Sequence, residues 1–208
     1  MTNEALLKKA LFWANILGLA PGVKAIFLSG SVAQNRAKET SDIDFFLIAK
    51  DGQIWTARFF VFGILKFFWQ MRTDDRHAGK ICPNHFITDT HLQIREQDAY
   101  SANLFSHNIP LYDPCLLYKK FVQENEVWVH SFGEQFRPHP GFKTSPNPGW
   151  ECKKISFFWR WIESCLQYAQ MEKIKRNHDY RLPGAKIILD DHELRFHPRP
   201  KNKSFSKL

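Results

Sequence analysis

Four residues in one short stretch of the sequence have the types and spacing needed to bind phosphate and a metal ion. Gly30 and Ser31 follow an apolar run that ends at Leu28, and Asp42 and Asp44 begin the next apolar run. A Gly-Ser turn from a strand into a helix presents free backbone N–H groups, which favour an anion. Two-residue periodicity puts both aspartates on one strand face, where close carboxylates attract a divalent cation.

A Gly-Ser turn after a strand, followed about ten residues later by Asp-x-Asp on a second strand, resembles the nucleotidyltransferase superfamily. That superfamily includes DNA polymerase beta and the aminoglycoside nucleotidyltransferases. The resemblance is clearest over residues 23–50 and implies that Asp42 and Asp44 hold Mg²⁺ or Mn²⁺. It also implies that Gly30 and Ser31 bind the triphosphate of a nucleoside triphosphate. The wider sequence is similar to bacterial nucleotidyltransferase-domain proteins of uncharacterised function.

The sequence departs from the superfamily pattern at two places. Many small members carry Arg-Gly where this chain has Gln34 and Asn35. Active members also bring a third carboxylate from a later strand, whereas the matching stretch 81–87 has none, and Asn84 or His85 stands there. Asparagine offers a neutral oxygen ligand. His85 could act as a base if its ring points into the cleft.

Other charged residues are candidates to complete such a site. Asp89 and Asp98 lie beyond the third strand and reach the metal only if their loop folds favourably. Arg36, Lys38 and Arg58 are the local candidates to neutralise a triphosphate, and each also suits a surface position. The nine histidines lack the spacing of a convincing zinc ligand set. The four cysteines lie far apart and predict reduced thiols.

The composition predicts a folded protein with an anionic ligand. A chain of 208 residues with 44% hydrophobic residues can bury a core as one large domain or as a domain with an extension. The net charge of +8 suits a nucleotide or nucleic acid, although much of the excess lies in a basic C-terminal tail. The first residues lack the pattern of a signal peptide, so we expect a cytoplasmic protein.

The hydrophobic pattern and the resemblance together predict an α/β (α+β) fold. A nucleotidyltransferase-like mixed sheet with flanking helices is expected over residues 1–113. A mainly helical C-terminal extension is expected over 114–208, with a Pro/Gly-rich loop at 133–149 and with Trp159 and Trp161 in the core. The expected helices cover 3–17, 32–38, 53–71, 97–106, 115–129 and 150–175, and the expected extended segments cover 23–28, 42–49, 80–87, 109–113, 185–189 and 193–197.

Several residues are expected at the ends of these elements. Asn3 and Asp51 are possible caps for the first and third helices. Pro83 predicts that the third strand lies at a sheet edge or contains a bulge. Asp113 followed by Pro114 is a typical helix start, with the aspartate as cap and the proline at the first helical position.

The apolar helix expected at 53–71 raises the question of a membrane. Arg58 and Lys66 leave only seven uninterrupted apolar residues between them, whereas a helix needs about 20 to span a bilayer. We therefore expect no transmembrane segment and interpret this helix as part of the core. Attachment to a membrane surface is the alternative.

The leading hypothesis for function is a metal-dependent transfer of a nucleoside monophosphate from a nucleoside triphosphate to a hydroxyl. The acceptor is not identified by the sequence and is a small molecule, a protein or an RNA end. One alternative is a catalytically degenerate protein that binds nucleotide or metal without turnover. Another is an interaction protein on the same fold, in which the helical extension docks a partner and the core is a scaffold. For the motif residues themselves, the alternatives are that Asp44 lies exposed on a solvated strand face and that Ser31 simply caps a helix.

Overall fold

A mixed sheet forms the centre of the computed structural model, which describes residues 1–73, 75–137, 157–176 and 186–197. Its six described strands lie in the order β4-β1-β2-β3-β6-β5. Strands β2 and β3 pair in parallel, and the other neighbouring pairs are antiparallel. The predicted α+β fold is confirmed. The strands are β1 (Val23–Ser29), β2 (Ile43–Ala49), β3 (Ile81–Thr88), β4 (Ile109–Tyr112), β5 (Lys186–Leu189) and β6 (Glu193–His197).

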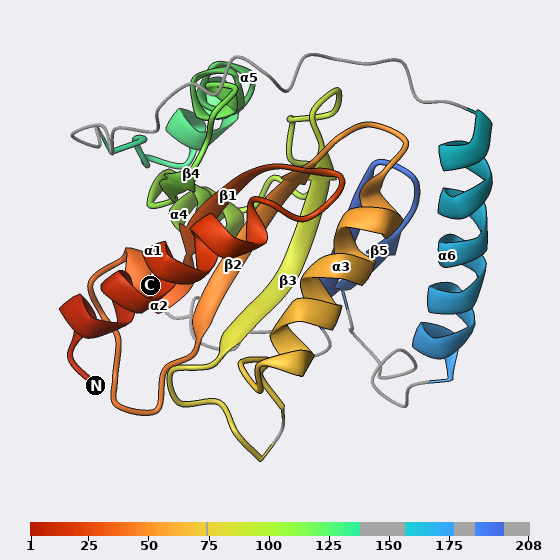
Figure 1. Cartoon of the computed structure of the whole chain (residues 1–208). Coiled ribbons are helices and arrows are strands. Elements are labelled where there is room, and N and C mark those ends of the chain that lie inside the picture. Colours follow the sequence, from red (N-terminus) through yellow and green to blue (C-terminus); the bar gives the residue numbers. More distant parts are fainter. Residues whose placement is uncertain (74, 138–156, 177–185, 198–208) are drawn as a thin grey trace.

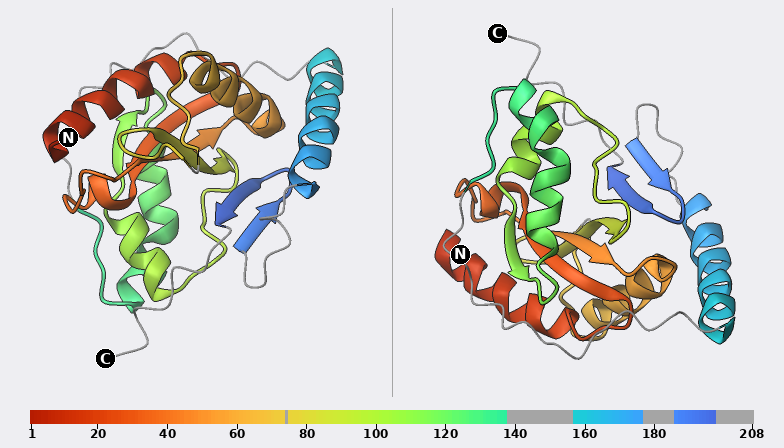
Figure 2. Two further views of the ribbon diagram at one scale, coloured as in Figure 1. Left: turned by 90° about the horizontal axis from the view of Figure 1, so that it is seen from below. Right: turned by 90° about the horizontal axis from the view of Figure 1, so that it is seen from above.

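Helices cover both faces of this sheet (Figure 1). Helices α1 and α3 pack on one face, while α4 and α5 pack on the other, so the sheet separates two buried clusters. Helix α6 lies against the outer side of α3 (Figures 1 and 2). The helices are α1 (Asn3–Leu17), α2 (Gly30–Ala33), α3 (Ile54–Phe67), α4 (Ala99–Ser106), α5 (Leu117–Ser131) and α6 (Phe157–Lys175).

Two helix ends differ from the sequence expectation. Thr2, and not Asn3, caps α1, since its hydroxyl accepts a hydrogen bond from the N–H of Ala5 at 3.3 Å. Helix α2 ends at Ala33 instead of extending to residue 38. Soon after this end the chain turns at Asn35, whose φ of 53° lies in the left-handed region that asparagine tolerates better than most residues.

Pro83 marks a bulge and not a sheet edge. Strand β3 is central, with β2 on one side and β6 on the other. Phe45 pairs with Pro83 and Phe46 pairs with His85, so Asn84 is the extra residue. Strand β6 pairs with β3 only from His85 onward. Pro83, which has no backbone N–H to donate, therefore lies outside the β3–β6 ladder.

Asp113 caps the first N–H groups of α5, but the prediction that Pro114 takes the first helical position was wrong, because Leu116 stands at the cap position and Pro114 precedes the helix. The Asp113 carboxylate accepts hydrogen bonds from the N–H groups of Leu117 at 2.8 Å and Tyr118 at 2.9 Å. The helix begins at Leu117 and not at Cys115, because Leu116 takes a left-handed conformation with φ of 54°.

The C-terminal part of the described chain completes the central sheet. The two extended segments predicted at 185–189 and 193–197 are strands β5 and β6, which pair as an antiparallel hairpin, and β6 pairs with His85, Phe86 and Ile87 of β3. The Pro/Gly-rich stretch from residue 138 onward lies outside the described residues, as do residues 150–156 of the last expected helix.

The prediction that the apolar third helix belongs to the core is confirmed. Ile54, Trp55, Val61 and Leu65 of α3 are buried against the sheet. The expectation that Trp161 lies in the core was wrong, since 60% of its surface is exposed. Across the described ranges, the structure contains no helix long and apolar enough to cross a membrane.

Glu163 of α6 caps the start of α3 from outside that helix. Its carboxylate accepts hydrogen bonds from the N–H of Trp55 at 2.7 Å and from both the N–H and hydroxyl of Thr56, at 2.9 and 2.6 Å. Asp51, the cap expected from sequence, does not fill this role, and Gln53 stands at the cap position without a side-chain hydrogen bond. Glu163 therefore joins α6 to the core by satisfying N–H groups that have no partner within α3.

Replacing Glu163 with alanine tests this contact. The free energy of unfolding should fall by about 1 to 3 kcal/mol, because buried donors of α3 lose their acceptor. Chemical denaturation followed by circular dichroism measures the loss. Glu172→Ala is the control on the same helix, since Glu172 makes only a partly exposed pair with Arg176. Equal effects of the two changes would contradict the capping role.

Candidate active site

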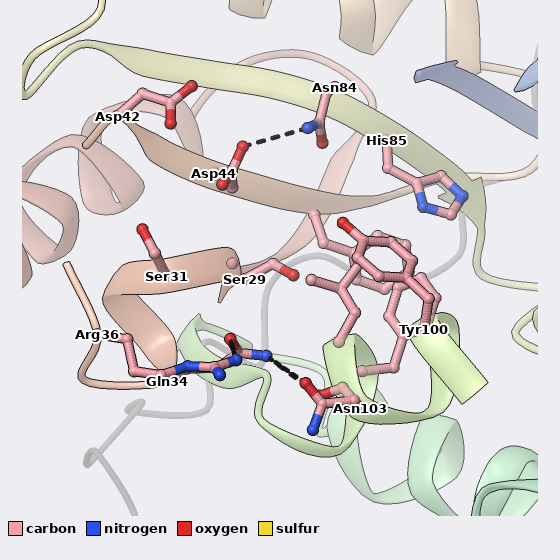
Figure 3. A pocket seen from close by; sticks show the side chains of 14 residues that line it. Ser29, Ser31, Gln34, Arg36, Asp42, Asp44, Asn84, His85, Tyr100 and Asn103 are labelled. Carbon is pink, nitrogen blue, oxygen red and sulfur yellow. Dashed lines mark hydrogen bonds between the residues drawn. The ribbon is translucent and has the colours of Figure 1, made fainter. Parts of the chain in front are cut away.

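A cavity of about 400 Å³ lies where the Gly-Ser turn faces β2, β3 and α4 (Figure 3). This volume falls within the range of small-molecule sites in proteins. The cavity brings together seven of the eight site residues predicted from the sequence, all except Lys38. Asp42 and Asp44 point into it from above the turn (Figure 3). It is lined by Ser29, Gly30, Ser31, Gln34, Arg36, Asp42, Asp44, Phe46, Asn84, His85, Tyr100, Asn103, Leu104 and Phe105.

Gly30 brings the backbone of the turn against the Asp44 carboxylate. The register of β1 and β2 pairs Ser29 with Asp44, so the turn begins directly beside that side chain. Gly30 has a φ of 70°, and a methyl group on its Cα would overlap the Asp44 carboxylate. Glycine is therefore required here both by the backbone conformation and by the space available.

The backbone around Ser31 forms one helical turn at the floor of the cavity. The first N–H groups of such a turn have no partner within the helix and are available to an anion. Ser29, and not Ser31, stands at the cap position. The Ser31 hydroxyl lies 3.3 Å from that of Ser41, which ties the turn to the loop that precedes Asp42.

A cluster of two carboxylates and one thiol lies near the start of β2 and is formed by Asp42, Asp44 and Cys82. One potential ligand atom from each lies within 4.8 Å of the other two. Burial, together with the charge of Asp44, raises the pKa of the Cys82 thiol to about 12, so the thiol stays protonated near neutral pH. A protonated thiol is a poor ligand for a hard cation, which leaves the two carboxylates as the fitting donors.

Arg72 contacts this cluster and was not identified from the sequence. Its Nε lies 3.2 Å from the Asp42 carboxylate, and its Nη1 lies 3.6 Å from the Cys82 sulfur. Although burial opposes its charge, Cys82, Asp42 and Asp44 together raise the pKa of Arg72. Arg72 follows α3 by several residues, and only the pairing of Met71 with Ile81 brings it beside Asp42.

The bulge in β3 turns two consecutive side chains toward the cavity. In a regular strand Asn84 and His85 would point to opposite faces, but the extra residue lets both line it. The Asn84 amide donates a hydrogen bond of 3.2 Å to the Asp44 carboxylate (Figure 3). Asn84 therefore stands beside Asp44, where the superfamily comparison leads one to expect a third acid.

His85 is held by a buried glutamate from the C-terminal hairpin. Its Nε2 lies 2.9 Å from the Glu193 carboxylate, and both side chains are 3% exposed. Burial lowers the pKa of His85 below its ordinary value, against the opposing effect of Glu193, so the ring is neutral at neutral pH. Because a carboxylate only accepts hydrogen bonds, Nε2 carries the proton and Nδ1 keeps its lone pair.

The three cationic residues proposed from the sequence as triphosphate ligands lie in different places. Arg36 lines the cavity and donates a hydrogen bond to Gln34, whereas Lys38 is exposed and is not among the lining residues. Arg58 lies elsewhere, with its guanidinium over the rings of Phe62 and Phe196. Burial lowers the pKa of Arg58 to about 10.

Neither of the later acids reaches the aspartate pair. The Asp89 carboxylate accepts a hydrogen bond from the N–H of Asp51 at 2.9 Å. The Asp98 carboxylate caps α4 by accepting from the N–H of Ser101 at 2.7 Å. Neither residue lines the cavity.

One wall of the cavity comes from α4 and was missed by the sequence analysis. Tyr100 and Asn103 face the Gly-Ser turn across the cavity (Figure 3), and Leu104 also lines it. The Gln34 amide donates to the Asn103 side-chain oxygen at 3.0 Å, which joins α4 to the chain after the turn. The sequence predicts this helix, but no pattern within it identifies which face meets the distant turn.

Residues 13–90 match the family model described as nucleotidyltransferase domain. No curated protein and no solved structure showed a significant match to the chain. The matched segment contains the Gly-Ser turn, both aspartates and β3, and it assigns this part of the chain to the nucleotidyltransferase superfamily. The resemblance drawn from the sequence is thereby confirmed. Domains of this family act on nucleoside triphosphates and generally use a divalent metal.

Replacing Gly30 with alanine tests the contact between the turn and Asp44. The change should lower the free energy of unfolding by about 2 kcal/mol or more, because it combines a left-handed backbone with a side-chain overlap. Gly63→Ala is the control. Gly63 lies within α3 with open space around its Cα, so the same substitution should raise stability by about 0.5 to 1 kcal/mol. A neutral Gly30→Ala variant would contradict the described geometry.

Proposed function

We propose that this protein transfers a nucleoside monophosphate from a nucleoside triphosphate to a hydroxyl acceptor, with a divalent metal held by Asp42 and Asp44. The observation that carries the proposal is the contact between the Gly30 turn and the Asp44 carboxylate inside one cavity. A turn suited to phosphate beside a pair of carboxylates suited to a metal allows one polyphosphate to contact both the backbone N–H groups and the ion.

The donor atoms favour Mg²⁺ or Mn²⁺ as the ion. Asp42 and Asp44 supply carboxylate oxygens, and Asn84 lies close enough to add an amide oxygen if its side chain turns over. Such an ion, when bound, neutralises phosphate charge and lowers the pKa of a coordinated oxygen. The protein's own contribution is to hold the carboxylates beside the turn, which fixes where the triphosphate can lie.

Backbone N–H groups and arginines are suited to the triphosphate. The one-turn helix α2 presents its first N–H groups at the floor of the cavity. Arg36 lines the cavity, and Arg72 lies at the aspartates, so two cations flank the space that the phosphates would fill. Lys38 is exposed on the loop between α2 and β2 and can contact only a ligand that extends beyond the cavity.

His85 is suited to accept the proton of the acceptor hydroxyl. Glu193 fixes its tautomer, so Nδ1 keeps a lone pair, and His85 lines the cavity near Asn84. The lowered pKa keeps the imidazole neutral, which is the form that can take a proton. The aromatic wall of Phe46, Tyr100 and Phe105 offers a surface for a nucleobase or for an apolar acceptor.

A catalytically degenerate nucleotide-binding protein is the second candidate. It is favoured by one observation, the amide of Asn84 in the place where a third carboxylate is expected. An interaction protein on the same fold would need neither nucleotide nor metal affinity.

Replacing Asp42 or Asp44 with asparagine tests the leading proposal. Each change should reduce pyrophosphate release from a mixture of ATP, GTP, CTP and UTP with Mg²⁺ by about 100-fold or more, because it removes a charged ligand at the reacting phosphate. Glu39→Gln is the control, since Glu39 is an exposed acid on the same loop and does not line the cavity.

Three outcomes separate the candidates in this assay. Turnover lost in both aspartate variants and kept in Glu39→Gln supports the enzyme. Nucleotide binding without pyrophosphate release by the unchanged protein, across a broad panel of hydroxyl acceptors, supports the degenerate form. Turnover unchanged in both aspartate variants contradicts the proposed role of the carboxylates.

Replacing Asn84 with aspartate tests the third ligand position. Without metal, the new carboxylate beside Asp44 should lower the free energy of unfolding by about 1 kcal/mol through like-charge repulsion. Saturating Mn²⁺ should abolish that loss, and Mn²⁺ affinity should rise about tenfold because the site gains a charged ligand. Thermal unfolding and Mn²⁺ titration measure both effects. An unchanged Mn²⁺ affinity would show that residue 84 does not face the ion.

A further inference from the structure

A second cluster of metal-binding side chains lies at the other end of β2. Asp51 lies in the loop after β2, His91 lies in the loop after β3, and His192 lies in the turn between β5 and β6. One potential ligand atom from each lies within 4.8 Å of the other two. Five residues of extended strand separate Asp44 from Ala49, or about 17 Å, so this cluster is distinct from the cavity.

We propose that Asp51, His91 and His192 form a binding site for a divalent transition metal of the Zn²⁺ class. Two imidazoles and one carboxylate are a common protein ligand set for Zn²⁺, with the remaining position open to water. The spacing of these residues in the sequence, 40 and then 101 positions apart, gives no zinc motif, and only the fold brings them together.

The geometry around His192 supports this assignment. Its Nδ1 lies 3.4 Å from the Asp51 carboxylate. This atom is buried and makes no hydrogen bond within the described part of the chain. Two ligands bound to one tetrahedral Zn²⁺ at ordinary bond lengths lie about 3.4 Å apart. The separation is therefore long for a hydrogen bond and suits a shared ion.

Neighbouring groups contact the His91 ring and the backbone of the other two residues. The Thr90 hydroxyl lies 3.0 Å from His91 Nδ1, which leaves Nε2 of that ring for a metal. Asp89 accepts from the N–H of Asp51, and Asp190 accepts from the N–H of His192 at 2.9 Å.

The two histidine rings also lie close together. They stack with centroids 3.7 Å apart and planes 25° apart. Neutral imidazole is the form that binds a metal. Binding of one ion by both rings requires His91 to turn out of the stack, which its exposed position permits.

The consequence of such a site would be a link between three loops. An ion held there joins the loop after β2, the loop after β3 and the turn of the C-terminal hairpin. Since β6 carries Glu193, which holds His85, the ion would stabilise the hairpin that completes the cavity.

Zn²⁺ titration of the chelator-treated, untagged full chain tests the proposal. The titration uses a background of Asp42→Asn and Asp44→Asn, which removes the other cluster. We expect one Zn²⁺ per chain by calorimetry, and a Zn²⁺-dependent rise in the temperature of unfolding. His91→Ala and His192→Ala should each weaken Zn²⁺ binding about tenfold or more.

Two further variants guard against an indirect effect. Asp51→Asn keeps the size of the side chain and should also weaken Zn²⁺ binding, while its unfolding temperature without metal should stay close to that of the background protein. His130→Ala removes an exposed histidine of α5 and should leave Zn²⁺ binding unchanged. The absence of saturable Zn²⁺ binding, or equal affinity in the background and the His91 and His192 variants, would overturn the proposal.

Discussion

The close approach of Gly30 to Asp44 is the contact on which the candidate site depends. The antiparallel register of β1 and β2 puts the end of one strand beside the beginning of the other, and the absence of a side chain at Gly30 lets the turn touch the carboxylate. This contact fixes the distance between backbone N–H groups that suit phosphate and oxygens that suit a metal. Any ligand that uses both must therefore lie in the cavity between the turn and α4.

The C-terminal part of the chain supports this site through two acids, the partly buried Glu163 and the buried Glu193. Glu163 satisfies the first N–H groups of α3, and Glu193 holds the His85 ring. Both acids are far in sequence from the groups they contact, and both use hydrogen bonds that would be costly to leave unmade in the core. The sheet is complete, and His85 has a fixed tautomer, only when β6 lies against β3.

The sequence predicted the elements well because their patterns are local. The Gly-Ser turn, the alternating face of β2 and the Asp113 cap all depend on residues within a few positions of each other, and each was confirmed as a structural feature. The bulge at Asn84 was one of two alternatives predicted from Pro83, because a proline in a strand indicates either a sheet edge or a bulge. Only the position of β6 beside β3 decides between the two.

The parts of the site that the sequence did not predict depend on distant contacts. Arg72 reaches Asp42 because the chain after α3 pairs with the start of β3, and Tyr100 faces the cavity because α4 packs across the sheet. The cap of α3 also comes from a distant contact, because Glu163 of α6, and not the neighbouring Asp51, accepts hydrogen bonds from its first N–H groups. Neither residue type nor spacing carries information of this kind.

A crystal structure with Mn²⁺ and a non-hydrolysable nucleoside triphosphate tests the central claim most directly. We expect an anomalous scattering peak between the carboxylates of Asp42 and Asp44, with the triphosphate lying against the backbone of Gly30 and Ser31. The Arg72 side chain, which contacts Asp42 in the absence of ligand, should move off that carboxylate or turn toward the phosphates. A triphosphate bound away from the Gly-Ser turn, or a peak that contacts neither aspartate, would contradict the proposed site.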